Sequence, residues 1–531
     1  MALFLGFDSS TQGLTALVLD CTGGERRVVF ERSLEYDSDF AEYGTQNGVW
    51  RRGGAAVTAS PLMWAEALDR MMELLASART FDPKGIAAIS GAAQQHGSVY
   101  LNASAADVLE SIDARVPLVS QLAGAFSRDE SPVWMDESTS AQCDAISRAL
   151  GGRQAVAELT GSAPFERFTG PQIRKFFEGE PQAYRGTSRI HLVSSFLASL
   201  LAGQDAPVEP GDAAGTNLLD IRACDWAPAA LEATAPSLRT RLPDVVPSAT
   251  VIGRLSRYWR DRYGFGDALV VAWTGDNPSA LVGSGLFSEG ALGVSLGTSD
   301  TLFGFSENPR PTATGSCHVF GAPSGGYMSL VCFRNGSLAR EAIRNQYGYD
   351  WEGFSRALRE TPAGNTGALM LPWFEPEITP HVARAGVRRL RLSVEDGAPN
   401  VRAVIESQMM AMANRAGMVT RQKIERVLAT GGASVNRDIL QVMADVFDAE
   451  VLPMARGNAA ALGAALRALH AHEQAGGREI SWPEVYEGVH AAEFAARIRP
   501  NPDSVRIYAT LRERYAEFER TEAEAAAELR F

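Results

Sequence analysis

Two short apolar runs open the chain, Leu3 to Phe7 and Leu14 to Leu19, and small polar residues join them. Runs of this length on either side of turn residues predict the two strands of a hairpin. Apolar residues then recur at helical spacing from Pro61 to Arg79, which predicts a helix. Residues 86–101 are apolar on both sides of a polar Gln-Gln-His corner, so they predict a strand, a turn and a second strand.

The same kinds of element return in the second half of the chain. Residues 268–285 predict a buried strand, a polar turn and a helix, and residues 291–305 predict another hairpin around a Gly, Ser, Thr and Asp turn. Further on we predict a strand, a glycine turn and a helix from Asn436, then helices over Asn458 to His472 and Ser504 to Leu529. The second half therefore looks like a divergent copy of the first.

The length of 531 residues corresponds to three to four domains of average size or to two large ones, and we expect an α/β fold. Residues 200–250 are rich in Pro, Gly, Ala and Asp without a sustained period, and we place the interdomain connection near Pro247 to Gly253. The expected domains are residues 1–250 and residues 251–531, with the last helix packing back on the first domain.

Charge and cysteine content narrow the choice of partner. The formal net charge is −13, which disfavours binding to nucleic acid or to an anionic membrane and favours a small solute. The five cysteines are widely spaced without a CxxC pair, so we expect neither a disulfide framework nor a zinc site. No run reaches 18 apolar residues, and the N-terminus lacks the pattern of a signal peptide, so we expect a cytoplasmic protein.

The two predicted hairpin turns carry the first chemical signal. The common nucleotide-binding and hydrolase motifs are absent, but Asp8 to Gly13 and Gly297 to Asp300 each combine small hydroxylic residues, glycine and an aspartate. Such turns let backbone N–H groups approach phosphate oxygens, and Asp8 can hold a hydrated magnesium ion that bridges the phosphates. Each turn alone is also typical of an ordinary hairpin. A third glycine turn, Gly431 to Ser434, makes the phosphate interpretation the better one.

Taken together, the motifs resemble those of the FGGY family of carbohydrate kinases, in the actin and hexokinase superfamily. The resemblance covers essentially the whole chain, and it is strongest to eukaryotic-type members that phosphorylate D-xylulose. Seven segments in family order carry it: LGFDSSTQG, SGAAQQHGS, TGSAPFERFTGPQI, WTGDNPSALVG, VSLGTSDTLF, CFRNGSLARE and ATGGASVNRDILQVMADVF. One departure is visible, because Ser10 stands where many members have glycine.

The resemblance implies a fold and a reaction. The expected fold is two ribonuclease H-like domains, each a mixed sheet flanked by helices, with the active site in the cleft between them. The expected reaction is phosphorylation of a D-xylulose hydroxyl by ATP with Mg²⁺, accompanied by closure of the cleft. The resemblance also implies a small-molecule enzyme without nucleic acid or membrane partners, and a homodimer is expected.

Asp276 is the residue that we expect to act as the general base. It follows the apolar run that ends at Thr274 and Gly275, on the turn before a predicted helix, where a carboxylate can be held rigidly. A carboxylate within hydrogen-bond reach of a sugar hydroxyl can accept its proton during attack on the γ-phosphorus. The alternative is a helix N-cap, since Asp is also common at helix starts. The family's general base falls at this position, which favours catalysis.

The resemblance assigns further contacts to sugar and nucleotide. Amide, imidazole and guanidinium groups supply the directional donors and acceptors that a sugar needs, and the expected sugar contacts are Gln95, His96, Arg167, Asp276 and Asn277. The expected ATP contacts are Ser9, Thr11, Gly297, Thr298, Trp351, Gly431, Gly432 and Asn436, with Asp8 on the metal. For Trp351, anchoring of its own helix is an equally good interpretation.

Three alternatives to this function stay open from the sequence. A kinase of the same family could act on another ketose or on a polyol, such as ribulose, because substrate choice depends on a few contacts. A nucleotide-dependent binding or filament protein would share the superfamily fold, but Asp276 and the polar sugar corner disfavour it. A sugar sensor without catalysis is disfavoured because both Asp8 and Asp276 are present.

Overall fold

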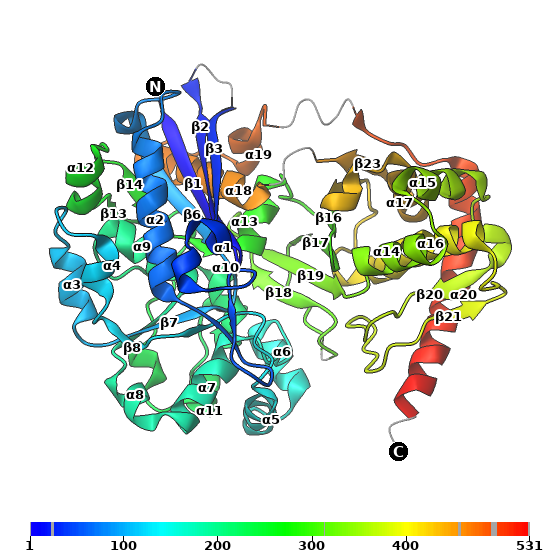
Figure 1. Ribbon diagram of the computed structural model, residues 1–531, viewed down its shortest axis with the longest axis horizontal. Coiled ribbons are helices and arrows are strands. Elements are labelled where there is room, and N and C mark those ends of the chain that lie inside the picture. The colour runs from blue at the N-terminus through cyan, green and yellow to red at the C-terminus, as the bar shows by residue number, and fades with distance from the viewer. Residues whose placement is uncertain (1, 23–25, 313, 455–457, 490–495, 529–531) are drawn as a thin grey trace.

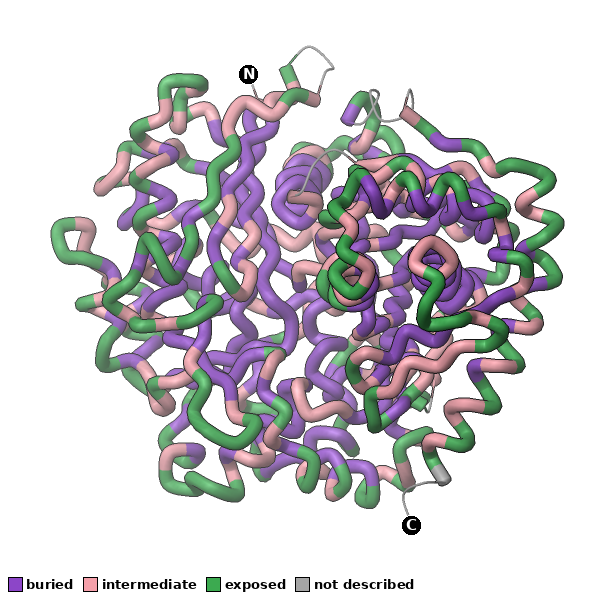
Figure 2. Tube along the Cα trace, turned by 45° about the vertical axis from the view of Figure 1, so that its right-hand side comes forward, coloured by how far each residue is buried: buried purple, intermediate pink, exposed green. Residues whose placement is uncertain are grey.

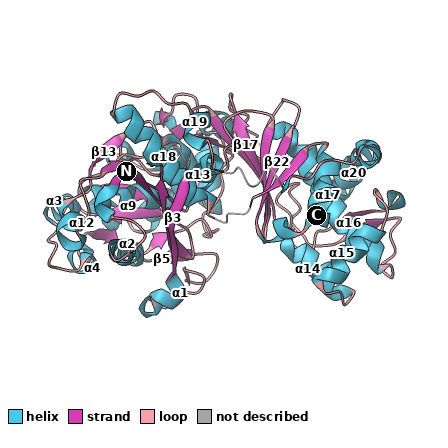
Figure 3. Cartoon of the chain, turned by 90° about the horizontal axis from the view of Figure 1, so that it is seen from above, coloured by secondary structure: helices cyan, strands magenta, loops and turns pink. Residues whose placement is uncertain are grey.

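Two large mixed β-sheets, each flanked by helices, organise the chain in the computed structural model, which describes residues 2–22, 26–312, 314–454, 458–489 and 496–528. The two sheets lie side by side, and each forms the centre of its own half of the molecule (Figure 1, Figure 3). Buried residues follow the strands and the helices packed against them (Figure 2).

The N-terminal sheet has the strand order β13-β14-β6-β1-β2-β3, with β15 paired to β6. The bounds are β1 Leu3–Ser9, β2 Gly13–Asp20, β3 Arg27–Glu35, β6 Ile86–Ala93, β13 Val251–Arg254, β14 Leu269–Val271 and β15 Thr274–Gly275. Strands β1, β2 and β3 are antiparallel neighbours, whereas β1, β6 and β14 run parallel. The predicted first hairpin is therefore the centre of this sheet.

The C-terminal sheet repeats that arrangement in the order β18-β19-β17-β16-β22-β23. The bounds are β16 Ala291–Leu296, β17 Asp300–Ser306, β18 His318–Gly321, β19 Tyr327–Phe333, β22 Arg426–Thr430 and β23 Glu450–Pro453. Strands β16, β17 and β19 are antiparallel, and β16, β22 and β23 run parallel. In both sheets, three consecutive antiparallel strands are followed by two strands that run parallel to the third. This arrangement agrees with the expected pair of ribonuclease H-like domains.

Helices from distant parts of the chain cover the N-terminal sheet. Successive side chains of a strand face opposite sides, so Leu3, Leu5 and Phe7 lie in the core that includes α2 (Pro61–Ala76) and α9 (Val193–Ala202). Phe4 lies on the opposite face, in the cluster with α18 (Ala459–Ala475). A Cβ atom on Gly6 would lie 2.1 Å from the Ala461 carbonyl oxygen, so glycine permits this close approach.

A second close approach joins α18 to α13 (Asp276–Gly283). A Cβ atom on Gly283 would lie 1.9 Å from the Ala459 carbonyl oxygen, and one on Gly463 would lie 1.9 Å from that of Ser279. The helix that begins at the expected catalytic aspartate is thus packed backbone to backbone against α18. The position of Asp276 is therefore tied to both the N-terminal sheet and the later part of the chain.

The C-terminal half has its own core around the long helix α16 (Gly397–Arg415). The other helices of this half include α14 (Ser337–Gln346), α15 (Trp351–Glu360), α17 (Arg437–Phe447) and α20 (Pro502–Glu528). Within the described residues, none of the helices combines the length and the apolar character needed to cross a bilayer.

Two features differ from the sequence-based domain assignment. Strands β13, β14 and β15 lie beyond residue 250 but pair within the N-terminal sheet, because β14 continues the parallel set beside β6. The last helix, α20, packs on α16 and α17 of the C-terminal half instead of the N-terminal half (Figure 1). Its Tyr508 hydroxyl lies 2.6 Å from a Glu406 carboxylate oxygen and donates a hydrogen bond to it, which fixes the helix there.

Candidate active site

Asp8 stands near the end of β1, on the face of the sheet that carries Phe4, Gly6 and α18. The residue is partly exposed, but its Oδ1 atom is buried and has no hydrogen-bond partner among the described residues. Burial raises the pKa of Asp8 to about 8, and the nearby Asp276 carboxylate adds to the shift. The first turn therefore presents a carboxylate whose charge the described residues do not balance.

Asp276 is the first residue of α13, and Gly275 occupies the N-cap position. The carboxylate is thus not the helix cap, and its Oδ1 accepts hydrogen bonds from the Asn277 backbone N–H (2.8 Å) and side-chain Nδ2 (2.9 Å). Loss of hydration raises the pKa of Asp276 to about 6, although N–H groups of Asn277 and Gln95 act in the opposite direction. A partly exposed carboxylate with this pKa suits a general base.

The polar corner after β6 is connected to Asp276 by hydrogen bonds. Gln95 accepts a bond from Asn277 Nδ2 (3.0 Å) through Oε1 and donates one from Nε2 to the Gly211 carbonyl oxygen (3.2 Å). Both ends of the Gln95 amide are thereby used inside the protein. The expected sugar contact Gln95 consequently orients Asn277, whose own Oδ1 has no partner among the described residues.

His96 lies beside Gln95 with φ at 72°, in the left-handed region. Its Nδ1 lies 2.6 Å from the Gly215 carbonyl oxygen, so Nδ1 carries the proton and Nε2 is left as an acceptor. Burial lowers the pKa of His96 to about 3, and the positive charge of Arg167 contributes. The Arg167 guanidinium lies 5.0 Å from the centre of the Phe165 ring. A neutral imidazole and a charged guanidinium therefore lie close together, next to the Gln95 corner.

A set of buried charges lies near Asp276. Asp212 accepts a hydrogen bond from the Ser194 hydroxyl, and its Oδ1 atom has no partner among the described residues. Burial raises the pKa of Asp212 to about 8, with a contribution from Asp276. Arg467 of α18 interacts electrostatically with both Asp212 and Glu209. Sequence reasoning did not single out these groups, because their proximity depends on tertiary contacts between distant segments.

The second turn, between β16 and β17, is built differently from the first. Gly297 is partly exposed and Thr298 is exposed, so backbone and hydroxyl donors can face a ligand. Asp300 is buried and forms two hydrogen bonds with Arg340, of 2.8 and 3.0 Å. Arg340 also donates to the Gly297 carbonyl oxygen (3.2 Å). The buried Asp300–Arg340 ion pair thus fixes the backbone of this turn.

The third turn lies against the end of β16. Gly431 has φ at 85°, and a Cβ atom there would lie 2.6 Å from the Leu296 carbonyl oxygen, so this position requires glycine. Asn436 caps α17 by accepting the N–H groups of Asp438 and Ile439, and its Nδ2 donates to the Ser355 hydroxyl (2.7 Å). The cap therefore links α17 to α15.

Trp351 begins α15, and its side chain is 44% exposed. The Arg344 guanidinium lies 4.6 Å from the centre of its ring, and the Phe354 ring centre lies at 5.5 Å. These contacts anchor the indole while leaving part of it open to solvent. The arrangement is compatible with both interpretations of Trp351, as a nucleotide contact and as a helix anchor.

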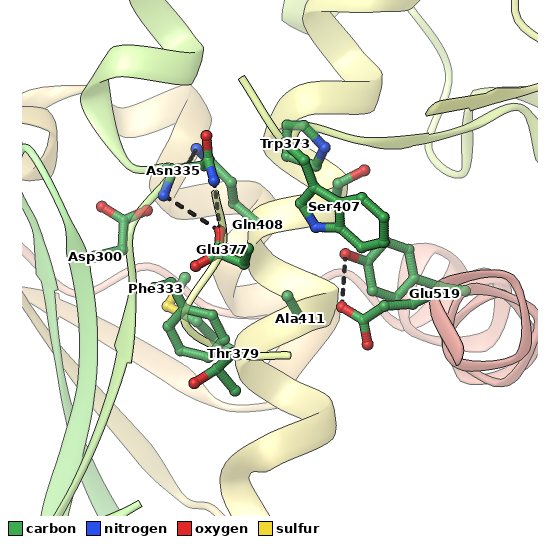
Figure 4. Close-up of a pocket in the computed structure, with 13 residues that line it drawn as sticks. Asp300, Phe333, Asn335, Trp373, Glu377, Thr379, Ser407, Gln408, Ala411 and Glu519 are labelled. Carbon is green, nitrogen blue, oxygen red and sulfur yellow. Dashed lines mark hydrogen bonds between the residues drawn. The ribbon is translucent and has the colours of Figure 1, made fainter. Parts of the chain in front are cut away.

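A small cavity lies behind the second turn and is lined by Asp300, Asn335, Glu377, Thr379 and Gln408 among others (Figure 4). Asn335 Nδ2 donates to Glu377 (2.8 Å), and Gln408 Nε2 donates to the Asn335 carbonyl oxygen (2.7 Å). The cavity offers about 20 Å³ to the centre of a water-sized sphere, which is room for a water molecule but not for a sugar or nucleotide. This cavity is therefore not a substrate site.

The structure brings together one group of expected residues around Asp276. Asp276 interacts directly with Asp8, Gln95 and Asn277. His96, the next residue after Gln95, interacts electrostatically with Arg167. The expected nucleotide residues Gly297, Gly431, Gly432 and Asn436 cluster around the end of β16 in the other half. Their roles toward ligands stay predictions.

Ser9 does not take the expected position. It follows Asp8 on β1, so its side chain faces the opposite side of the sheet. The hydroxyl is fully buried and lies 3.0 Å from the Tyr36 hydroxyl. Ser9 can therefore offer a phosphate only its backbone, whereas the Thr11 hydroxyl is partly exposed and accepts a hydrogen bond from Trp134 Nε1 (2.7 Å).

A magnesium ion would find one carboxylate in the first turn. Among the described residues there is no group of three His, Cys, Asp or Glu side chains that could hold a metal. Magnesium in phosphotransfer sites is commonly held by one or two carboxylates together with phosphates and water. The buried, unpartnered Oδ1 of Asp8 fits that requirement.

Comparison with known proteins places this geometry in a family. Residues 130–283 match the N-terminal domain, and residues 292–472 the C-terminal domain, of the FGGY family of carbohydrate kinases. Xylulose kinase of Rattus norvegicus is 43% identical over 525 residues, which cover 97% of this chain and 96% of that protein. Xylulose kinase 2 of Arabidopsis thaliana is 41% identical over 493 residues, with coverage of 88% and 87%.

Solved structures agree in fold. A xyloylose kinase from Brucella ovis superposes with a TM-score of 0.82 at 22% identity, covering 97% of this chain and 98% of that one. A gluconate kinase from Lactobacillus acidophilus gives 0.83 at 19% identity, with 99% of both chains covered. Kinases with different sugars in their names match equally well, so the fold alone does not select the sugar.

Proposed function

Because this chain belongs to the FGGY family of carbohydrate kinases, we propose that it transfers the γ-phosphoryl group of ATP to D-xylulose. The products would be D-xylulose 5-phosphate and ADP. Near full-length similarity to a xylulose kinase supports the choice of sugar. The observation that carries the chemistry is the Asp276 carboxylate, which is held by Asn277 at the start of α13.

In the proposed reaction, the terminal hydroxyl of the sugar binds beside Asp276. The carboxylate accepts the hydroxyl proton while the hydroxyl oxygen bonds to the γ-phosphorus, and the bond from that phosphorus to the β,γ-bridging oxygen breaks. Raising the pKa of Asp276 to about 6 makes the carboxylate a better base than a hydrated aspartate, while it remains ionised at neutral pH.

The remaining sugar hydroxyls require both donors and acceptors. Arg167 supplies donors, His96 Nε2 supplies an acceptor, and Asn277 Oδ1 supplies another, since Asn277 Nδ2 is already used. On the nucleotide side, the exposed turn at Gly297 and Thr298 supports binding of phosphates, and the turn at Gly431 supports binding nearer the adenosine.

Asp8 would hold Mg²⁺, which when bound supplies positive charge to the phosphates. We also expect the two halves to close over the substrates, because water near Asp276 would compete with the sugar as acceptor. A decrease in the radius of gyration on adding sugar and a non-hydrolysable ATP analogue would measure this closure. The homodimer and the cytoplasmic location stay predictions.

The test is ADP formation from ATP and Mg²⁺ with D-xylulose, D-ribulose, an aldose and a polyol. We expect D-xylulose to be preferred, and Asp276→Asn to lower kcat by about 10³-fold, within the usual range for a general base. Asp445→Asn is a matched control, because burial also raises the pKa of Asp445, but this residue lies on α17, where it accepts the Asn501 N–H. It should keep the wild-type kcat.

The pH profile gives a second readout of the same site. The base must be ionised, so kcat/KM should fall as the pH drops through about 6, the pKa of Asp276. Preference for another sugar would change the substrate but keep the mechanism. Substantial turnover by Asp276→Asn would remove Asp276 as the base, and turnover without any sugar would favour a nucleotide-dependent binding protein.

A further inference from the structure

His318 is a buried histidine of the C-terminal half that lies near His96 and Arg167, two of the expected sugar-binding residues of the N-terminal half. We propose that His318 is a sugar-binding residue, so that both sheets contribute side chains to the sugar site; this rests on the proposed function. His318 begins β18 and pairs with Leu330 of β19. Sequence reasoning did not select it, because nothing in the sequence places residue 318 beside residues 96 and 167.

Strand β18 brings His318 across to the N-terminal half. It is an edge strand of the C-terminal sheet, and it packs against α10 (Pro210–Ala213). A Cβ atom on Gly321 of β18 would lie 2.9 Å from Pro210 Cβ and 3.1 Å from the Gly211 backbone nitrogen. Gly211 is the residue whose carbonyl oxygen accepts the Gln95 amide. The strand thus lies directly against the segment that supports the sugar corner.

The same phenylalanine rings surround His318 and the expected sugar ligand His96. The ring centre of Phe168 lies 5.5 Å from that of His318 and 4.6 Å from that of His96. The ring centre of Phe320 lies 6.2 and 6.4 Å from the same two imidazoles. The ring centre of Phe165 lies 5.4 Å from that of His318, and the Arg167 guanidinium lies 5.0 Å from the same Phe165 ring centre. Two imidazoles and one guanidinium therefore lie against one set of three rings, Phe165, Phe168 and Phe320, which we call the aromatic frame.

One ring nitrogen of His318 has no hydrogen-bond partner among the described residues. The residue is 4% exposed, and its Nδ1 is buried without a hydrogen-bond partner among the described residues. A buried polar atom without a partner destabilises the fold unless a ligand or water satisfies it. By contrast, the buried His191 uses both ring nitrogens, toward Ser195 and Asp205. His318 is thus a candidate to meet a bound molecule.

The chemistry of the frame suits hydroxyl groups. Burial and the positive charge of Arg167 lower the pKa of His318, so its ring is neutral at physiological pH and offers one donor and one acceptor. Arg167 adds donors, and His96 adds the acceptor Nε2. Aromatic rings beside such groups are a common way to bind the C–H faces and hydroxyls of a sugar. The combination favours a polyhydroxylated ligand over an anion.

The test uses two substitutions at His318 and one matched control. His318→Phe keeps an aromatic ring and removes both nitrogens, whereas His318→Asn keeps a polar atom near the position of Nδ1. His470→Phe is the control, because His470 is also buried and stacks on Trp482 at 4.2 Å, but it lies on α18 beside α19 (Trp482–Tyr486). All three are compared with wild type for KM, kcat, Tm and calorimetric binding of D-xylulose.

We expect His318→Phe to raise both the KM and the calorimetric Kd for D-xylulose by about tenfold, the effect of losing one hydrogen bond in a desolvated site. The KM for ATP should stay within about twofold of wild type. His318→Asn should recover part of the sugar affinity, and His470→Phe should change neither constant.

Two results would overturn the role of His318. One is an unchanged sugar affinity in His318→Phe, which would make the imidazole a packing residue. The other is a fall in Tm accompanied by equal rises in the KM for sugar and the KM for ATP, which would indicate general disruption. Wild-type protein that neither binds nor phosphorylates any sugar would instead refute the proposed function. A preference for another sugar leaves the test intact with that sugar as the probe.

Discussion

The two hairpin turns with phosphate-binding character have similar residues and opposite electrostatics. In the first, Asp8 is partly exposed, its buried Oδ1 has no partner among the described residues, and Asp276 is a charged neighbour of the same sign. In the second, Asp300 is buried against Arg340, which donates two hydrogen bonds to the carboxylate and one to the Gly297 carbonyl oxygen. One carboxylate is neutralised within the protein, and the other is not.

This difference assigns different tasks to similar motifs. A carboxylate without a protein cation can attract an external one, so the first turn suits a metal ion and the phosphates that it accompanies. A carboxylate that is fully paired with arginine cannot do this, and it acts instead as a support for the backbone of the turn. In our proposal, the position of a single arginine, distant in sequence, makes the difference between a turn that holds a metal ion and a turn whose aspartate only supports the backbone.

The largest expected effect comes from breaking the second turn's ion pair. Arg340→Met leaves the Asp300 carboxylate buried without its cation, and we expect a loss of about 3–5 kcal/mol in the free energy of unfolding. Urea denaturation measures it. Adding Asp300→Leu to Arg340→Met should restore most of the stability, because an apolar pair of similar volume replaces the charges. Equal stability of wild type and Arg340→Met would refute this supporting role of the ion pair.

The first turn should respond in the opposite way. Asp8→Asn removes the carboxylate that would hold the metal, and we expect kcat to fall by about 10²–10³-fold, equivalent to about 3–4 kcal/mol. The variant should nevertheless be at least as stable as wild type, because burial disfavours the ionisation of Asp8 and an amide carries no such penalty. Steady-state kinetics and thermal melting check the two halves of this prediction, and a strongly destabilised Asp8→Asn would contradict it.

The pH dependence of stability sharpens the same comparison in metal-free buffer. The pKa of Asp8 is about 8 in the folded protein, above its value of 3.8 in the unfolded chain. Between these values the folded protein holds a proton that the unfolded chain has released, so the Asp8 contribution to stability falls as pH rises through this window. The Tm of Asp8→Asn relative to wild type should therefore increase from pH 5 to pH 8.

The local elements were predictable because their signals lie in short stretches of sequence. The predicted hairpin runs fall within β1 and β2, the helix predicted to start at Pro61 is α2, and the helix predicted from Asn436 is α17, which Asn436 caps. The pairing of elements was harder. Residues after 250 belong to the N-terminal sheet, and α18 covers it, because strand pairing and helix packing act between segments hundreds of residues apart.

The same division holds within the site. Asp8, His96 and Asp276 could be selected because each stands in a turn next to a predicted strand and in a recognisable motif. The direction of the Ser9 side chain was not anticipated, because the alternation of strand side chains turns it into the core, where it meets Tyr36. His318 and Arg340 were not selected from the sequence, because the presence or absence of a buried partner is not visible from neighbouring residues.

The smallest expected effect concerns the hydrogen bond from Trp134 to Thr11 of the first turn. Trp134 is 40% exposed, and its Nε1 donates a hydrogen bond to the Thr11 hydroxyl at 2.7 Å. Trp134→Phe removes one neutral hydrogen bond, worth about 0.5–1.5 kcal/mol, so the KM for ATP should rise by about two- to tenfold. Steady-state kinetics at saturating sugar would measure this change.

A matched tryptophan separates the turn from general effects of the substitution. Trp226 Nε1 also donates a hydrogen bond at 2.7 Å, to the Pro243 carbonyl oxygen, and Trp226 is buried between elements that do not include either turn. Trp226→Phe should lower Tm and leave the KM for ATP unchanged. Trp134→Phe should raise the KM for ATP and leave Tm nearly unchanged. If both variants raised that KM equally, the first turn would not depend on the indole, and its geometry would come from the strands alone.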